Sequence, residues 1–465
     1  MARLLDLPTE LITQIISNLS GRAHDLCCLS LVSWTVHTIT EPILYGIYSH
    51  ETLKQAYSFR PFLRTIVRYP KLASHVRLAK IRSWRTAQNV HSFLDEAVPP
   101  SGKDLHLFIE AAKSVPLNAE AGWHELISRG TEDAEVMLLV SQLPNLQELH
   151  LALPPQSPLR WMFVVNEANK ALRGEAAAFD SLKALCVEND ANEGGFQLVT
   201  VAPFFKLPSL RTFQAYQCQD GSWTAEKYSA FAEKNIGKFC ITSINIEWSM
   251  LSIEAVNALV RGCKALKSFK YSHHYKVGSR LSTEQFTTRE LIRALENHCE
   301  TLEHFRLDLH SGWDPQMWLR LMEEEDDFRL GDIRNFTKLV TLDVEQTALL
   351  TEDPKRQTNS RPFVEMMPSS LQMLTIRSCS DSIVPHMQNL SILCKDFLPQ
   401  LKQVEITAIK EVVSNVITYN AKIWSERWTL TKAFSPSVDF RMKEKINTGA
   451  GLNGFWPLPP PTWRT

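Results

Sequence analysis

The 465-residue sequence lacks several features that would place it in a class at once. No apolar run approaches the roughly 18 residues that a membrane-spanning helix requires. Lys and Arg nearly balance Asp and Glu, for a formal net charge of −1, and this balance does not favour a nucleic-acid partner. We therefore expect a protein that contacts neither membranes nor nucleic acids.

The cysteine spacing does not indicate a set of disulfide bonds. The nine cysteines are scattered, only Cys27 and Cys28 are adjacent, and no C-x-x-C pair occurs. An odd, scattered set is typical of a reducing compartment. Asp6 and Glu10 interrupt the stretch where a secretion signal would need an uninterrupted apolar core. We therefore expect an intracellular protein, cytoplasmic or nuclear.

Motifs that carry catalysis are absent too. The sequence has no Walker-type loop, no G-x-S-x-G elbow and no H-E-x-x-H. Residues 449–454 match the dinucleotide fingerprint as a string, but Phe455-Trp456-Pro457 follows where a helix would have to begin. His273 and His274 are neighbours that would point to opposite faces of a strand, which makes a poor chelate. We expect no enzyme, no cofactor and no metal; an enzyme whose site is assembled from distant residues is the least favoured alternative.

Residues 5–45 predict a group of short helices. Pro8 suits a first helical turn, where its missing N–H costs nothing. Apolar residues then recur at helical spacing from Leu11 to Leu19, and Ser20-Gly21 ends the pattern. This spacing predicts an amphipathic first helix.

Two further helices are predicted in the same segment. Asp25 is a candidate N-cap for the second. The third spans residues 33–40 and should stop at Glu41-Pro42, because the residue before a proline is pushed out of the α region. A segment this small can hardly bury its apolar surface alone, so we expect it to need a partner surface.

The spacing of residues in this segment follows a longer motif. Its anchors are Leu7-Pro8-x-Glu10-Leu11, Ile15, Leu19, Asp25-Leu26, Leu29, Leu31-Val32-Ser33 and Glu41-Pro42-x-Leu44-Tyr45. This pattern resembles the F-box motif in the form common among fungal F-box proteins. Trp34 stands where many F-boxes have a basic residue, and Val36 where they have a tryptophan. The resemblance implies docking on the Skp adaptor of a cullin–RING ubiquitin ligase through Leu7, Pro8, Ile15, Leu19, Leu26, Leu29 and Val32.

A second pattern, L-x-x-L-x-L, recurs in the rest of the chain with a mean spacing near 32 residues. Its nine copies start at Leu146, Leu182, Leu210, Ile241, Leu266, Leu302, Leu339, Leu371 and Leu401. Ala73, Val76 and Leu78 are a candidate outlying first copy. The last two apolar residues of a copy lie on one side of a short strand. Strands separated by helical spacers become parallel neighbours, and stacking them buries a continuous core.

This repeat resembles the leucine-rich repeat. In that family the position three residues after the last template leucine often holds asparagine or cysteine, and Cys218 and Cys379 stand there. The fold class expected is α/β: an N-terminal three-helix F-box followed by an irregular leucine-rich-repeat solenoid with a parallel sheet on its concave face.

The domain boundaries follow from these patterns. We expect the F-box over residues 1–48, and a helical linker with divergent first repeats over 49–142. The solenoid should span 143–433 and end in a closing helix over 411–432. Residues 434–465 are polar and then rich in Pro and Gly, and we expect an extended or disordered tail.

Residues that alternate with the core positions should face the concave side, where repeat proteins usually hold a partner. The candidates for substrate contact are His150, Tyr216, Lys270, His304, Arg306 and Arg377. The two resemblances together imply a substrate-recognition subunit of a Skp–cullin–F-box ubiquitin ligase. Its partners would be the Skp adaptor, cullin through that adaptor, and a protein substrate. The alternative is a leucine-rich-repeat interaction scaffold that is not engaged in ubiquitination.

Overall fold

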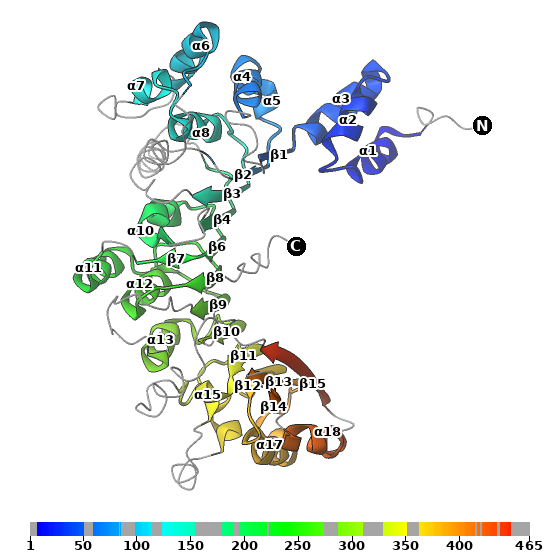
Figure 1. Cartoon of the computed structure of the whole chain (residues 1–465), viewed down its shortest axis with the longest axis vertical. Helices are drawn as coiled ribbons and strands as arrows, with labels where there is room; N and C mark the ends of the chain where they lie inside the picture. The colour runs from blue at the N-terminus through cyan, green and yellow to red at the C-terminus, as the bar shows by residue number, and fades with distance from the viewer. Residues whose placement is uncertain are drawn as a thin grey trace. The chain divides into compact units, whose positions relative to one another are not determined.

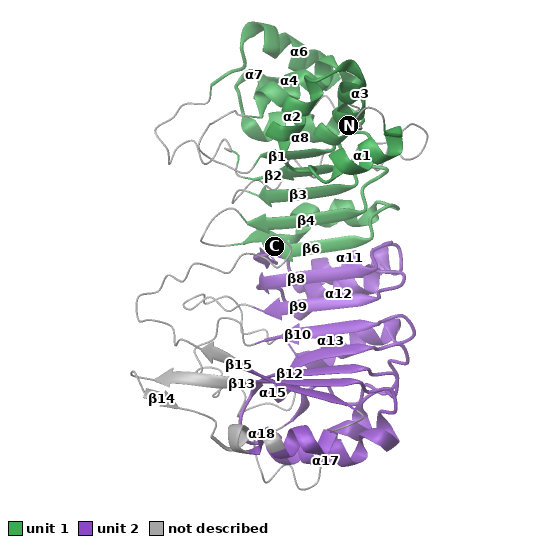
Figure 2. Ribbon diagram, turned by 90° about the vertical axis from the view of Figure 1, so that its right-hand side faces the viewer, with its two compact units in different colours: residues 1–215 green, residues 216–465 purple. Residues whose placement is uncertain are grey.

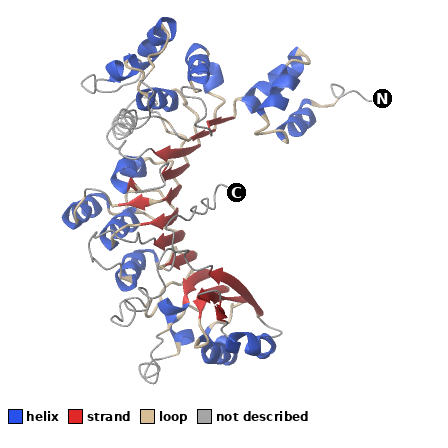
Figure 3. Ribbon diagram, in the orientation of Figure 1, coloured by secondary structure: helices blue, strands red, loops and turns tan. Residues whose placement is uncertain are grey.

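The computed structural model of the chain describes residues 7–50, 59–82, 84, 98–113, 123–153, 179–189, 195–220, 223–273, 287–309, 329–350, 362–413, 416–418, 421–434 and 438–447. The chain divides into two compact units, unit 1 over Met1–Ala215 and unit 2 over Tyr216–Thr465 (Figure 2). Both units combine helices with strands, as expected for an α/β fold (Figure 3).

Unit 1 begins with three short helices, α1 (Thr9–Ser17), α2 (Ala23–Ser30) and α3 (Trp34–Leu44) (Figure 1). They share a small apolar core of their own, which confirms the predicted three-helix segment. This core consists of Ile12, Ile16, Leu26 and Val36, with Leu7, Leu19, Leu29, Ile39, Ile43 and Leu44 packed against it. Few side chains are fully buried, as expected for a segment of this size.

Helix α2 starts earlier than the sequence predicts. It begins at Ala23, and Asp25 lies in its first turn instead of capping it. The Asp25 carboxylate pairs with Arg22 at 2.6 Å. An acidic residue in the first turn stabilises the positive end of the helix dipole, so Asp25 still favours a start at this place.

Helix α3 ends later than the sequence predicts. It begins after Ser33 as expected, but it passes Glu41-Pro42 and ends at Leu44. Pro42 lies in the last turn, where its ring removes only one helical hydrogen bond. Helical hydrogen bonding continues past the proline: the Tyr45 N–H donates to the Glu41 carbonyl at 3.0 Å.

The longer strands of unit 1 lie in the order β1-β2-β3-β4-β6, and the pairs from β1 to β4 are parallel. The strands are β1 (Ile47–His50), β2 (Leu78–Ile81), β3 (Glu148–Leu153), β4 (Ala184–Asn189), β5 (Phe196–Gln197) and β6 (Thr212–Tyr216). The remaining helices are α4 (Arg60–Arg68), α5 (Pro70–Ala73), α6 (Gly102–Lys113), α7 (Trp123–Ser128), α8 (Glu132–Ser141), α10 (Leu198–Val201) and η3 (Ala202–Lys206).

In unit 2 the strands from β8 to β13 are parallel neighbours in chain order. The strands are β7 (Cys218–Gln219), β8 (Ser243–Ser249), β9 (Ser268–His273), β10 (His304–Asp308), β11 (Thr341–Glu345), β12 (Met373–Cys379), β13 (Gln403–Val413), β14 (Val416–Thr418) and β15 (Asp439–Asn447). The helices are α11 (Ala225–Asn235), α12 (Ile253–Gly262), α13 (Thr288–Leu295), η4 (Glu296–His298), α15 (Gln346–Leu349), η6 (Phe363–Met366), α17 (Ile383–Phe397) and α18 (Ala421–Phe434). Helices α11, α12 and α13 lie on one side of strands β8–β10 (Figure 3).

The apolar template positions meet one another across the strands. Leu149 pairs with Leu185 in unit 1. In unit 2, Phe269 pairs with Phe305, which pairs with Leu342. All five side chains are at most 2% exposed. The strands therefore stack their apolar residues into a continuous core within each unit, which confirms the predicted repeat architecture.

The first repeat copy starts three residues later than predicted. The sequence suggests Ala73, Val76 and Leu78, but the register pairs Ala79 with Leu149. The copy therefore starts at Val76, and its second template position is an alanine. The sequence pattern did not reveal this position, because the small side chain of Ala79 contributes little to the apolar signal of the L-x-x-L-x-L repeat.

Three strands end in the same irregularity. Gln217, Trp248 and Ser378 have φ of 58°, 52° and 54°, and each lies two residues after the last template residue of its copy. The residue that follows each of them is buried: Cys218, Ser249 and Cys379. A left-handed residue at this point breaks the strict alternation of a strand, so the next side chain turns into the core. This explains why a small side chain stands at the cysteine position of the repeat.

The end of unit 2 differs from the predicted closing helix over residues 411–432. Strand β13 continues to Val413 and pairs with β14 in antiparallel fashion. Helix α18 therefore starts only at Ala421. The run of valines that suggested a helix is β-branched, and such residues pack well on a pleated strand.

Residues 438–447, which the sequence places in the tail, include strand β15. It pairs with β13 in parallel fashion from Asp439 to Asn447. Phe440 and Met442 are buried, whereas Arg441 between them is exposed. This alternation of period 2 is the signal in the sequence that indicates a strand. Residues 448–465 lie outside the described part of the chain.

Ion pairs join the helices of unit 1, and one of them is buried. Arg60 of α4 donates from Nε and Nη2 to the two carboxylate oxygens of Glu135 on α8, at 2.7 and 2.6 Å. The Glu135 side chain is fully buried and that of Arg60 is 11% exposed. A second pair joins Arg64 of α4 to Asp104 of α6, with bonds of 2.7 and 2.5 Å. Bidentate pairs of this kind fix the mutual orientation of the helices.

Burial raises the pKa of Glu135 to about 7 even though Arg60 opposes this effect. We predict that Arg60→Met destabilises the protein by up to about 3–5 kcal/mol at pH 8, and by less at lower pH where Glu135 takes up a proton, because the buried carboxylate loses its cation. The double variant Arg60→Met/Glu135→Leu should recover most of this loss. Urea denaturation of the full chain measures both. Arg129→Met, which breaks the exposed Arg129–Glu125 pair, is the matched control and should cost less than about 1 kcal/mol. Equal losses in Arg60→Met and in the control would contradict the prediction.

His298 is held in unit 2 as a neutral imidazole. Its side chain is buried, and its Nδ1 accepts a hydrogen bond from the Leu266 N–H at 3.3 Å. Its Nε2 donates to the Val260 carbonyl at 3.0 Å, a tautomer that follows from these two partners. Burial lowers the pKa of His298 below its ordinary value, and the bond to Val260 offsets only part of this effect.

We predict that His298 lowers the free energy of unfolding as the pH falls from about 7.5 to 5.5, since the unfolded state binds a proton at His298 more readily than the native state does. The contribution of one such group is at most about 1.4 kcal/mol per pH unit. His298→Gln removes the titrating group and should flatten the pH dependence in urea denaturation. Identical slopes for the two proteins would contradict the prediction.

Candidate interaction surfaces

Large apolar side chains are exposed on the three N-terminal helices. They are Leu11 and Ile15 on α1, both 46% exposed, and Leu31, Val32 and Trp34 at the turn from α2 to α3, which are 86%, 67% and 81% exposed. We call these five residues the apolar helical face. Exposed apolar side chains concentrated in so short a segment are characteristic of interaction sites.

The residues predicted to dock on the Skp adaptor divide between this face and the core behind it. Ile15 and Val32 belong to the face, and Pro8 is also exposed. Leu26 is buried, and the other predicted residues, Leu7, Leu19 and Leu29, are half-buried against the core.

Leu11, Leu31 and Trp34 were not among the predicted contact residues. The sequence did give a reason to single out Trp34, because it occupies a position where many F-boxes have a basic residue. Its ring packs on His37, with ring centroids 5.4 Å apart, and it otherwise projects into solvent.

The three helices join the rest of unit 1 at the C-terminal end of α3. Glu41 lies 3.7 Å from both Lys71 and His75. Tyr48 of β1 stacks on Phe62 of α4 with ring centroids 4.0 Å apart, and burial raises the pKa of its phenol. None of these contacts uses a residue of the apolar helical face, so the junction leaves that face uncovered.

A second candidate surface lies on unit 2, on the side of strands β9–β12 that carries the residues alternating with the core. We call it the open strand face; it comprises Ser268, Lys270, His304, Arg306, Thr341, Asp343, Met373, Thr375 and Arg377. The register places Lys270, Arg306 and Asp343 side by side on successive strands. Charged side chains thus form a band across neighbouring strands.

Arg377 is fixed within this band by the chain itself. Its Nε donates to Asp343 at 2.7 Å, its Nη1 donates to Asp308, and its Nη2 donates to the Leu307 carbonyl at 2.9 Å. The side chain is only 15% exposed. Burial lowers the pKa of Arg377, but the surrounding carboxylates raise it more, so it stays charged. Arg377 therefore serves to hold β10, β11 and β12 together.

Arg306 is the more available guanidinium. It lies 3.4 Å from Asp343 and 3.9 Å from Asp308, carboxylates that Arg377 also binds, and its side chain is 40% exposed. Lys270 is exposed and has no ion pair among the described residues. His304 is exposed and forms a hydrogen bond of 3.1 Å with the Thr341 hydroxyl. The structure therefore brings four of the six predicted contact residues together on the open strand face: Lys270, His304, Arg306 and Arg377.

The other two predicted contact residues lie elsewhere. His150 is on β3 in unit 1, with its side chain 18% exposed and 3.8 Å from Glu148. Burial, with Lys80 and Arg82 nearby, lowers the pKa of His150 to about 4, so it is neutral at physiological pH. Tyr216 was expected to face the partner but is 5% exposed. It is the last residue of β6, directly before the left-handed turn that ends the alternation.

Within the described ranges, no group of three or more His, Cys, Asp or Glu side chains could hold a metal ion. His273 is buried and bonded to the Tyr271 hydroxyl at 2.7 Å, while His274 lies outside the described residues. In the same part of the chain, no helix combines the length and the apolar character needed to cross a membrane.

Two protein-family models match the chain, and each matched range includes one of the two candidate surfaces. The F-box domain family matches residues 4–42, which include the apolar helical face. The leucine-rich repeat domain family matches residues 192–424, half of the chain, which include the open strand face. A search of curated proteins finds no significant match. The chain therefore belongs to the leucine-rich-repeat proteins and is an F-box protein whose repeats follow the F-box.

Proposed function

We propose that this protein is the substrate-recognition subunit of a Skp–cullin–F-box ubiquitin ligase. F-box and leucine-rich repeat domains are generally non-catalytic, and together they serve substrate recognition in ligases of this class. The apolar helical face would bind the Skp adaptor, and the open strand face would bind a protein substrate. The ligase chemistry would belong to other subunits, while this chain supplies proximity and orientation.

The observation that carries this proposal is the exposure of the apolar helical face inside the F-box match. Burying one large apolar side chain on a partner contributes about 1.5–3 kcal/mol. Leu31 and Trp34 are more than four-fifths exposed and offer most of this gain. Tryptophan is enriched among the residues that contribute most of the binding energy in protein interfaces.

The alternative, a repeat scaffold outside ubiquitination, is favoured by one observation. The exposed Trp34 stands where many F-boxes have a basic residue, and the core residue Val36 stands where they have a tryptophan. A surface altered in this way could serve a partner other than the Skp adaptor. Direct measurement of adaptor binding separates the two proposals.

We predict that Ile15→Glu/Val32→Glu weakens binding to a purified Skp adaptor by about 100-fold or more, because two carboxylates would have to be desolvated in an apolar interface. Both residues are exposed, so the helices should stay folded. The matched control is Ile392→Glu on α17, which also changes an exposed isoleucine, 73% accessible. Isothermal titration calorimetry with the full chain measures the affinities. Failure of the unmodified protein to bind the adaptor would overturn the ligase proposal and favour the scaffold.

We predict that Lys270→Gln/Arg306→Gln reduces the capture of substrate proteins while adaptor binding stays unchanged, because the change removes the two available cations of the open strand face. The control is Lys264→Gln/Arg261→Gln, an equal loss of charge at exposed residues of unit 2 outside that face. Quantitative affinity purification of the full chains compares the proteins retained. If both double variants fail to retain the same proteins, the open strand face is not the recognition surface.

A further inference from the structure

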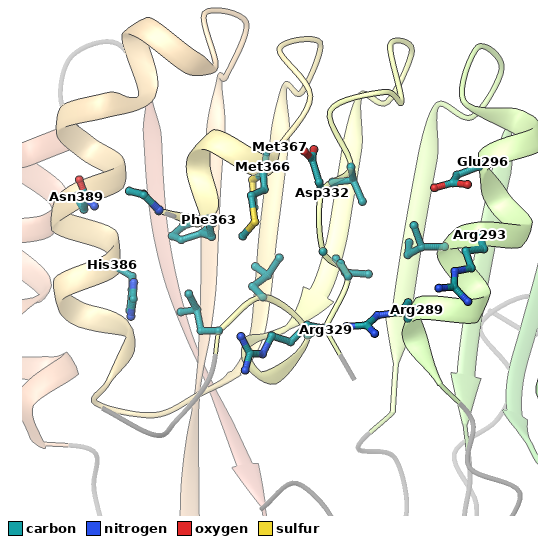
Figure 4. A pocket seen from close by; sticks show the side chains of 18 residues that line it. Arg289, Arg293, Glu296, Arg329, Asp332, Phe363, Met366, Met367, His386 and Asn389 are labelled. Carbon is teal, nitrogen blue, oxygen red and sulfur yellow. The ribbon is translucent and has the colours of Figure 1, made fainter. Parts of the chain in front are cut away.

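Unit 2 contains a cavity of about 550 Å³ that neither proposed binding surface uses, bordered by α13, η6 and α17 (Figure 4). Its lining combines apolar side chains such as Phe363 with charged side chains of both signs. Arg289 and Arg329 already have interaction partners in the chain. Asp332 forms an ion pair with Arg334 at 2.5 Å. The lining therefore selects no single class of ligand, and the apolar helical face of unit 1 offers a more specific arrangement.

Trp34 is the one aromatic residue of the apolar helical face. Its side chain is 81% exposed, so no surrounding core fixes its conformation. An exposed side chain populates several rotamers in water, and a partner that binds only one of them has to bear the cost of immobilising it. A contact within the protein that holds the indole ring before binding reduces this cost.

His37 provides such a contact from one turn further along α3. The imidazole and the indole are stacked, with ring centroids 5.4 Å apart and ring planes inclined by 22°. Residues three apart on a helix lie on the same face, and this separation is within the usual range of offset-stacked aromatic pairs. His37 therefore supports one side of the Trp34 ring while most of the indole stays open to solvent.

Glu41 in turn restrains His37. The Nε2 atom of His37 lies 3.5 Å from one carboxylate oxygen of Glu41. The other carboxylate oxygen lies 3.7 Å from both Lys71 Nζ and His75 Nε2, which belong to the chain that follows the F-box match. Trp34, His37 and Glu41 thus form a row along α3, from the apolar helical face to the junction with the rest of unit 1.

The charged side chains of helix α2, which packs against α3, are engaged elsewhere. Asp25 pairs with Arg22 at 2.6 Å and lies 3.6 Å from His24. In the part of the chain that the structure describes, His37 forms no ion pair other than the one with Glu41. The position of its imidazole is therefore set by the carboxylate of Glu41 on one side and by the indole of Trp34 on the other.

We infer that His37 is a positioning residue for the adaptor contact, and that it holds the indole of Trp34 in the orientation that the adaptor binds. Glu41 supports His37 in this role. The inference rests on the proposed function, because it assigns His37 a part in binding the Skp adaptor. His37 acts through Trp34, so its effect on adaptor affinity has to disappear when the indole is removed.

The test is a double-mutant cycle in isothermal titration calorimetry with the full chain and the purified Skp adaptor. We expect Trp34→Ala to weaken binding by about tenfold or more. His37→Ala should weaken it by about threefold to tenfold, the range that one aromatic stack accounts for, and should have no further effect in the Trp34→Ala background. His37→Phe keeps a flat ring against Trp34 and should restore most of the affinity. The matched control is His24→Ala on α2, whose side chain is 90% exposed, and it should bind as the unmodified protein does.

A second measurement does not need the adaptor. With fluorinated tryptophan incorporated in the full chain, the fluorine NMR resonance of Trp34 is identified by its loss in Trp34→Phe. This resonance should shift in His37→Ala and stay in place in His24→Ala. Thermal unfolding of each variant checks that a loss of binding is not a loss of fold.

The outcomes separate this inference from the proposed function. An equal effect of His37→Ala with and without Trp34, or a Trp34 resonance that does not respond to His37→Ala, would overturn the inference and leave the ligase proposal intact. Failure of the unmodified chain to bind the adaptor would overturn the ligase proposal and, with it, this role of His37.

Discussion

The architecture depends on the register between parallel strands. Each strand of a repeat places two apolar side chains against the same two positions of its neighbour, as in the pairing of Leu342 with Leu374 and of Val344 with Ile376. All four side chains are fully buried. A shift by one residue would turn these side chains to solvent and carry polar ones into the core. This constraint allows spacers of very different length, because it acts only on a few residues in each repeat.

The same constraint explains what could be predicted from the sequence. The template residues could be found because each of them packs against the strands of both neighbouring repeats, and this packing requires large apolar side chains at fixed spacing. Ala79 was missed because the small side chain of alanine carries little of the apolar signal on which the repeat pattern depends. Strand β15 was missed because its two buried residues, Phe440 and Met442, form a signal too short to stand out. The extension of α3 through Pro42 was missed because a proline in a last turn breaks only one bond.

The residues of the candidate surfaces could be predicted from the sequence only in part. Alternation along a strand indicates which residues face outward, and Lys270, His304 and Arg306 do so. It does not indicate which charges neutralise each other, because partners such as Arg377 and Asp308 come from strands two repeats apart.

Because strand β15 pairs with β13, it limits how far the protein can be shortened from its C-terminal side. Strand β13 has its hydrogen-bonding groups satisfied on that side by residues Asp439 to Asn447, which follow helix α18. A fragment ending at Phe434 would keep every repeat and the last long helix, yet it would present a bare row of amide and carbonyl groups along β13. Such a row is a template for a second polypeptide, so a shortened protein would be prone to pair with its own copies and to form insoluble assemblies.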